Sequence, residues 1–319
     1  SDLYRAHPDW ILQTPKRNSC SGRNQYVLDF SRKEVINCIY DMMYRILSEA
    51  KISYIKWDMN RSITECYSAA LPADRQGEVF HRYILGVYDL YERLNTAFPQ
   101  ILFESCASGG GRFDPGILYY APQGWTSDDT DAAERVKIQY GTSMCYPVSS
   151  MGSHVSAVPN HQLNRSTPLH TRANVAYFGT FGYELDLNKL SDEEIYQVKE
   201  QINFMKKYRD LIQFGTFYRL KSPFEGNETV WMTVSQDKKN ALVFWYRERN
   251  LVNADYTRVR LQGLDPDLIY KNEYNGIENY GDELMNLGLL TTDGTAGEPT
   301  CEDAPCTDYE SRIYVLTAR

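Results

Sequence analysis

One short run decides the fold of this chain: Tyr54-Ile55-Lys56-Trp57-Asp58-Met59-Asn60-Arg61. Aromatic and β-branched residues fill its first half and predict a strand over residues 52–57. A carboxylate, Asp58, follows that strand directly. Two further predicted strands, residues 101–104 and 124–126, also lead into polar residues, so chemistry is expected where the strands end.

Strands and helices alternate through the first two thirds of the sequence. Apolar residues at helical spacing predict helices over residues 31–47, 77–98, 132–140 and 191–212. Ser31 with Glu34, and Ser191 with Glu194, have the spacing of capping boxes. More strands are expected at residues 144–148 and 183–187. This alternation predicts a parallel sheet with right-handed crossovers. Polar motifs at the strand ends place a site at the C-terminal rim of a (β/α)₈ barrel.

The pattern changes after about residue 214. Strands are predicted at residues 228–236, 241–247, 257–261 and 313–316, joined by turns, and they indicate a small antiparallel β-sandwich. We therefore predict a partial (β/α)₈ catalytic barrel over residues 1–214 and an antiparallel β domain over residues 215–319. Only about five barrel strands are found where a closed barrel needs eight. The chain is accordingly expected to be part of a longer enzyme.

Composition excludes several classes of partner. The net charge of −8 argues against nucleic acid and anionic membranes, which need a basic surface. No apolar run is long enough to span a membrane, and no signal peptide is visible. Seven cysteines, mostly far apart, favour reduced thiols and a cytoplasmic location, although Cys301 and Cys306 could pair. No His/Cys spacing indicates a metal, and no cofactor is predicted.

Two more runs accompany the first. One is Phe103-Glu104-Ser105-Cys106-Ala107-Ser108-Gly109-Gly110-Gly111-Arg112-Phe113-Asp114, and the other is Trp125-Thr126-Ser127-Asp128-Asp129-Thr130-Asp131. The order and spacing of the three runs resemble the α-galactosidases of glycoside hydrolase family 36, and the resemblance extends from Ser1 to about Leu220. It implies a retaining glycosidase in which Asp58 is the nucleophile and Asp128 is the general acid/base.

The resemblance also implies a set of sugar-binding residues around the two aspartates: Arg23, Lys56, Trp57, Asn60, Cys106, Ser108 and Gly109. Lys56 and Asp58 are two apart on a strand and share a face, so the ammonium is expected to lower the pKa of the Asp58 carboxyl. Asp129 and Asp131 lie close to Asp128, and like charges favour the protonated form that an acid needs.

The expected activity is hydrolysis of terminal α-galactose from melibiose- or raffinose-type sugars. The resemblance also implies that the full-length protein is a homo-oligomer, a tetramer. Three alternatives stay open. The first is a galactosyl transferase of the same family. The second is a metal-dependent phosphoryl-transfer enzyme that uses Asp128, Asp129 and Asp131. The third is a sugar-binding fragment without catalytic activity.

Overall fold

The structure is a computed structural model that describes residues 1–252, 256–291 and 308–319. These residues form two compact units, Ser1–Asp128 and Asp129–Arg319. The five cysteines in the described ranges are all free thiols. Cys301 and Cys306, the pair for which a disulfide was considered, lie outside the described residues. None of the described helices is both long enough and apolar enough to cross a membrane.

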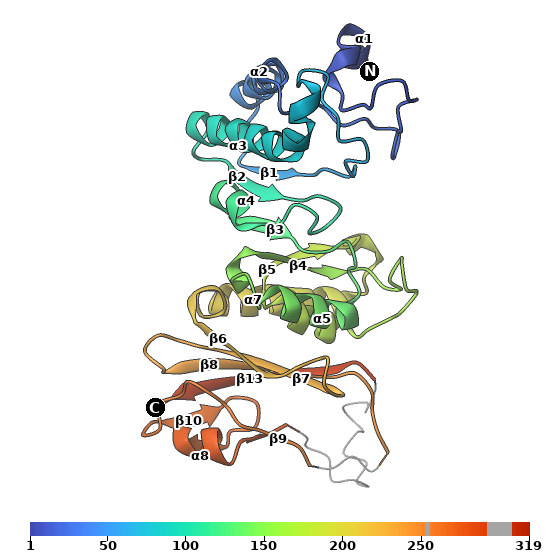
Figure 1. Ribbon diagram of the computed structural model, residues 1–319. Coiled ribbons are helices and arrows are strands. Elements are labelled where there is room, and N and C mark those ends of the chain that lie inside the picture. Colours follow the sequence, from blue (N-terminus) through green and yellow to red (C-terminus); the bar gives the residue numbers. More distant parts are fainter. Residues whose placement is uncertain (253–255, 292–307) are drawn as a thin grey trace. The chain divides into compact units, whose positions relative to one another are not determined.

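The first unit contains three parallel strands, each preceded or followed by a helix (Figure 1). The strands pair in the order β1-β2-β3, with Lys56 opposite Glu104 and Glu104 opposite Gln123. The elements are α1 (Asp2–Ala6), α2 (Lys33–Glu49), β1 (Tyr54–Trp57), α3 (Val79–Ala97), β2 (Leu102–Ser105), α4 (Pro115–Tyr120) and β3 (Gln123–Trp125).

Helices α2, α3 and α4 cover one face of these strands. Ile55, Trp57 and Phe103 point to that face and pack with the apolar stripes of the helices into one core. The alternation of side chains along a strand sends Lys56 and Glu104 to the opposite face. The helix-free face of the three strands is therefore the polar one.

The second unit begins with two more parallel strands, β4 (Met151–Ser156) and β5 (Thr180–Glu184). Their helices are α5 (Ala132–Thr142), α6 (Leu169–Ala176) and α7 (Asp192–Phe214). The strand predicted at residues 144–148 is wrong: this segment is a turn, and the strand comes after Pro147 and a short 3₁₀ turn. The sequence showed little sign of β4 because small buried residues, Gly152 and Ser153, separate its two buried apolar residues, Met151 and Val155.

An antiparallel sheet follows α7, with strand order β11-β10-β13-β8-β7-β6 (Figure 1). One face packs on α6 and α7 through Trp231, Leu242 and Phe244, and the other encloses a separate core around Val243 and Trp245. The elements are β6 (Thr216–Lys221), β7 (Glu228–Val234), β8 (Asn240–Arg247), β9 (Arg258–Val259), β10 (Ile269–Asn272), β11 (Glu278–Tyr280), α8 (Gly281–Asn286), β12 (Leu289–Leu290) and β13 (Glu310–Ala318).

The predicted fold class, an incomplete (β/α)₈ barrel followed by a small antiparallel β domain, is confirmed. The secondary structure changes type between Phe214 and Thr216, as the sequence indicated. The compact units divide elsewhere, after Asp128, because the antiparallel sheet shares a core with α6 and α7. A domain boundary at residue 214 therefore stays a prediction.

The two predicted capping boxes have different outcomes. Ser191 and Glu194 form one at the start of α7, as expected. The box at Ser31 is wrong, because α2 begins at Lys33 and the Ser31 hydroxyl donates to Asp29 Oδ1 instead. Arg32 is the N-cap residue of α2, so Ser31 lies one residue too early to cap the helix.

Candidate active site

Asp58 lies directly after β1 and is surrounded by hydrogen-bond donors. Asn60 Nδ2 donates to Asp58 Oδ2 at 2.6 Å, and the backbone N–H of Ser108 donates to Oδ1 at 3.4 Å. The Ser108 hydroxyl in turn donates to Asn60 Oδ1 at 3.2 Å and orients the amide. The strand end and the loop after β2 are joined by Met59 N–H to Cys106 O, at 3.1 Å. The donors fix the carboxylate in one place.

These contacts determine the charge of Asp58. Burial raises the pKa of its carboxyl, but hydrogen bonds from Cys106, Asn60 and the Ser108 backbone outweigh burial, so the net pKa is lower than usual. Burial and the neighbouring carboxylate raise the pKa of the Cys106 thiol to about 11. The thiol is therefore protonated near neutral pH and can donate to Asp58. The predicted direction of the Asp58 shift is supported, but hydrogen bonds are its chief cause, where we expected the Lys56 ammonium.

The glycine run after β2 packs directly against the segment that carries Asp128. Gly109 has a φ of +81°, and a Cβ on it would lie 2.7 Å from Ser127 Cα and 2.9 Å from the Asp128 nitrogen. A Cβ on Gly110 would lie 2.7 Å from Thr126 O. Only glycine permits this approach. The loop after β2 thus contacts the Asp58 loop on one side and the Asp128 loop on the other.

Asp128 follows β3, and its side chain is exposed. Among the described residues it has no recorded hydrogen bond or ion pair, in contrast to Asp58. The first unit therefore brings together two aspartates from neighbouring strand ends in different surroundings, one held by donors and the other unconstrained. Different surroundings are what separate the two roles in a pair of catalytic carboxyl groups.

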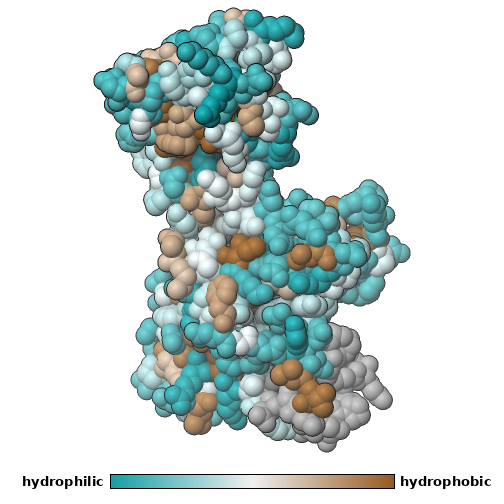
Figure 2. All heavy atoms as spheres, turned by 45° about the vertical axis from the view of Figure 1, so that its right-hand side comes forward, coloured by the Kyte–Doolittle hydropathy of each residue, from teal (hydrophilic) through white to brown (hydrophobic). Residues whose placement is uncertain are grey.

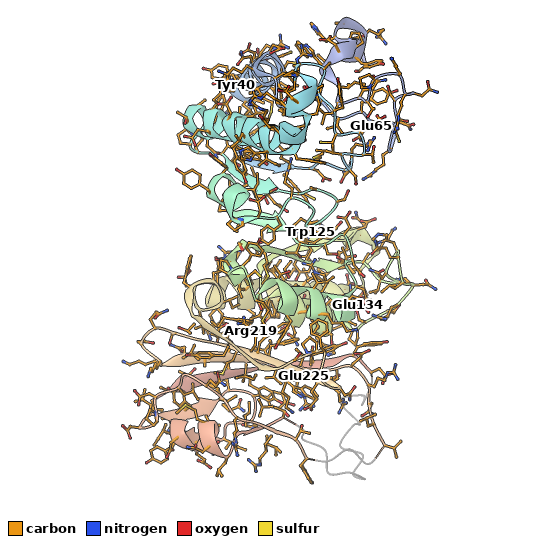
Figure 3. All side chains as sticks on the ribbon, in the orientation of Figure 1. Tyr40, Glu65, Trp125, Glu134, Arg219 and Glu225 are labelled. Carbon is orange, nitrogen blue, oxygen red and sulfur yellow. The ribbon has the colours of Figure 1, made fainter. Side chains whose placement is uncertain are left out.

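Lys56 has two partners that the sequence did not reveal. Its Nζ lies 3.6 Å from Glu104 Oε1 and 4.6 Å from the centre of the Trp125 ring. Trp125 is buried at the end of β3, where Figure 3 labels it. Glu104 is buried and accepts a hydrogen bond from the Tyr54 hydroxyl. Because the register puts Glu104 opposite Lys56, pairing of β1 with β2 was the signal that could have found it.

Trp57 is the one predicted binding residue whose placement argues against its role. Its indole lies on the helix-covered face of β1, with its ring centroid 4.6 Å from Tyr91 and 6.5 Å from Phe103. Strand alternation turns Trp57 away whenever Lys56 faces the polar side. This packing is at odds with direct contact to a sugar, and we omit Trp57 from the proposed site.

Arg23 lies at the tip of a two-residue turn. Arg23 and Asn24 have φ values of 51° and 58°, and Gly22 and Gln25 exchange backbone hydrogen bonds across the turn. The buried Arg61 side chain fastens this turn through the carbonyls of Gln25 and Cys20, at 3.1 and 2.6 Å. Arg61, the last residue of the opening motif, was not predicted to have a role, yet it ties the Asp58 segment to the loop that carries Arg23.

Asp131 has a structural function. Its carboxylate caps α5 by accepting from the N–H groups of Ala133 and Glu134, and it pairs with Arg165 Nη1 at 2.5 Å. In Figure 3, Glu134 is labelled on the same helix. Because cap and ion pair occupy this carboxylate, the arrangement does not favour the metal site considered for Asp128, Asp129 and Asp131. Within the described ranges, no group of three or more His, Cys, Asp or Glu side chains could hold a metal ion.

Parallel strands whose ends present a hydrogen-bonded aspartate, a second free-standing aspartate and a polar loop are the arrangement of barrel-type glycoside hydrolases. Comparison with known families agrees. Residues 1–215 match the Melibiase family, and residues 228–316 match the glycosyl hydrolase family 36 C-terminal domain. The chain belongs to the Melibiase family and, within it, to the family 36 α-galactosidase group.

Curated relatives and solved structures show the same likeness. The chain is 55% identical over 289 residues to α-galactosidase AgaA of Geobacillus stearothermophilus, covering 91% of this chain and 40% of AgaA. It is 53% identical over 289 residues to Mel36A of Lactobacillus acidophilus, covering 91% and 39% of the two chains. The AgaA crystal structure has a TM-score of 0.94 and 51% identity, covering all of this chain and 43% of AgaA. The chain thus spans well under half the length of these relatives.

Proposed function

We propose that the protein carrying this chain is a retaining α-galactosidase that releases terminal α-D-galactose from small oligosaccharides. The observation that carries the proposal is the pair of aspartates at adjacent strand ends, joined through the glycine loop, with Asp58 ionised by its donors. Variants of the related AgaA were crystallised with raffinose and with stachyose. Sugars of the melibiose and raffinose type are therefore the proposed substrates.

The chemistry follows from the different surroundings of the two carboxyl groups. The Asp58 carboxylate attacks the anomeric carbon while Asp128 gives its proton to the departing glycosidic oxygen, which leaves galactose bonded to Asp58. Asp128, now ionised, takes a proton from water, and the water oxygen breaks the bond to Asp58. The sugar keeps its anomeric configuration because it is inverted twice.

The proposed ligands of the galactosyl group come from the same strand ends. They are Arg23, Lys56, Asn60, Cys106, Ser108 and Gly109. Asn60 and Ser108 already contact Asp58 or each other, so they form one hydrogen-bonded group at the attacking carboxylate. The roles of Asp58 and Asp128 and of these six residues are proposals that rest on this placement and on the family resemblance.

Two substitutions in the full-length gene product test the roles. Asp58→Ala is expected to abolish release of p-nitrophenol from its α-galactoside, because no covalent intermediate can form. Asp128→Ala is expected to slow substrates with poor leaving groups by about 10²–10⁴-fold and to spare the activated aryl galactoside, with azide restoring turnover as a galactosyl azide. Equal loss on all substrates, without azide rescue, would count against Asp128 as the acid.

Hydrolysis and transfer share the first half of this mechanism. Hydrolysis, with water as the acceptor, is the proposed reaction. Product analysis after incubation with added sucrose separates the two: free galactose indicates hydrolysis, and a galactosylated sucrose indicates the transferase.

We also propose a cytoplasmic location and a homo-oligomeric, tetrameric full-length protein. Free thiols at all five cysteines of the described residues support the location, since a reducing compartment keeps them so. The assembly rests on the family resemblance. Light scattering on the full-length product measures it, and a monomer would refute it.

A further inference from the structure

Lys56 is held by contacts that leave its hydrogen-bond donors unused. Its ammonium lies 3.6 Å from Glu104 Oε1 and 4.6 Å from the centre of the Trp125 ring, and among the described residues it makes no hydrogen bond. Ion pairing at this distance and a cation–π contact fix the position of a charge without demanding one N–H direction. The ammonium can therefore still direct N–H donors toward a ligand.

Glu104 is suited to hold that ammonium. Its side chain is 3% exposed, whereas that of Lys56 is 38% exposed. The Tyr54 hydroxyl donates to Oε2, and no donor in the described part of the chain forms a hydrogen bond with Oε1. A buried carboxylate oxygen without a donor is costly unless a cation lies near it, and the Lys56 ammonium is that cation. Strand register fixes Glu104, while Lys56 has a flexible stem.

We propose that Glu104 is a positioning residue for sugar binding: with the Tyr54 hydroxyl on one oxygen, it holds the Lys56 ammonium over Trp125 so that its N–H donors face the galactosyl ring at Asp58. This inference rests on the proposed function. It assigns no chemical step to Glu104, which acts through Lys56. Because the lysine would contact the sugar equally before and during reaction, loss of Glu104 should act on KM more than on kcat.

A double-mutant cycle in the full-length gene product tests the coupling. Glu104→Gln is expected to raise KM for p-nitrophenyl α-galactoside about tenfold and to change kcat by less than about threefold. In a Lys56→Met background, adding Glu104→Gln is expected to change KM by less than about twofold, since the group it positions is gone. An equal rise in KM in both backgrounds, or a fall in kcat at constant KM, would overturn the proposal.

Two further variants make the test robust: the first is a control, and the second replaces Glu104→Gln if that variant does not fold. Glu228→Gln alters a matched, mostly buried glutamate that pairs with Lys221 and accepts from Trp245 Nε1, far along the chain in the antiparallel sheet. It is expected to leave KM and kcat unchanged. If Glu104→Gln does not fold, Tyr54→Phe decides: it removes the donor, keeps the charge, and should raise KM only when Lys56 is present. No change in KM would refute the inference.

The outcomes also separate this inference from the proposed function. Activity that survives Asp58→Ala would refute the proposed nucleophile. It would also refute the inference that Lys56 faces a galactosyl ring bound at Asp58. Activity that is abolished by Asp58→Ala, together with additive effects of Glu104 and Lys56, would refute the positioning role alone.

Discussion

At the residue scale, the two aspartates lie in different surroundings, and this difference supports the different roles proposed for them. Asp58 is fixed by Asn60 Nδ2 and the Ser108 N–H, and its pKa is lowered although burial opposes this. Asp128 is exposed and has no recorded polar partner among the residues that the structure describes. A carboxylate rich in donors stays ionised, as a nucleophile must. The neighbours of the two aspartates thus provide the different surroundings that the two proposed roles require.

The pH dependence of kcat/KM tests this account of Asp58. The carboxyl is ionised above its pKa, and the folded pKa lies below the ordinary value of 3.8. Protonation of Asp58 should therefore reduce kcat/KM only as the pH falls below about this value. Asn60→Ala removes a donor to the ionised form, so the acid limb of the profile is expected to move to higher pH. An unchanged or lower acid limb would contradict the role of the Asn60 amide.

At the scale of the element, the loop after β2 determines where Asp128 lies. Gly109 has a positive φ, and its backbone lies so close to the backbone of Ser127 and Asp128 that a Cβ on Gly109 would clash with it. Gly110 makes the same kind of approach to Thr126. The loop after β2 therefore fixes the position of the segment after β3 relative to the end of β2. It thereby also sets the distance between the carboxyl groups of Asp58 and Asp128.

Gly109→Ala tests whether the loop after β2 positions Asp128. The substitution places a methyl group against backbone atoms and adds strain of about 1–3 kcal/mol at a left-handed position. Activity is expected to fall by at least about tenfold as Asp128 is displaced. Gly141→Ala is the matched control, because a Cβ there meets nothing within 4 Å inside α5, so activity should be retained and stability slightly raised. Full activity in Gly109→Ala would refute the argument.

Helix α5 provides a second test at this scale. Asp131 caps the helix and pairs with Arg165, so Asp131→Ala is expected to lower the free energy of unfolding by about 1–2 kcal/mol for the cap alone. Thermal unfolding measures the loss, and Asp131→Asn should recover part of it because the amide oxygen can still cap. A loss of activity restored by added Mg²⁺, without a change in Tm, would instead support the metal hypothesis.

At the scale of the whole molecule, the described residues supply three parallel strands in one unit and two in the other. A closed barrel contains eight. The polar face of β1, with half-exposed Lys56, is one side of a site that a closed barrel would enclose. The chain spans about two fifths of AgaA. Activity should therefore be measured both for the chain and for the full-length gene product.

The 319-residue chain and the full-length gene product are therefore compared directly. We expect p-nitrophenol release from the α-galactoside by the full-length product and none above background from the chain alone. The described residues supply five parallel strands, and a barrel that lacks strands would not exclude water from the proposed sugar site. Asp58→Ala should abolish activity wherever it is found. Equal specific activity of both lengths would show that the additional strands are dispensable.

The sequence by itself determined the alternation of strands and helices, the antiparallel C-terminal part and the two aspartates, because each is encoded in local periodicity or in a run at a strand end. It could not determine partners across strands. Glu104 beside Lys56, Cys106 beside Asp58 and Gly109 against Asp128 arise from register and loop packing between distant segments. Strand β4 escaped prediction for the same reason, since its small polar residues are buried only by their tertiary neighbours. Short-range patterns specify elements, whereas the tertiary structure alone decides which side chains meet.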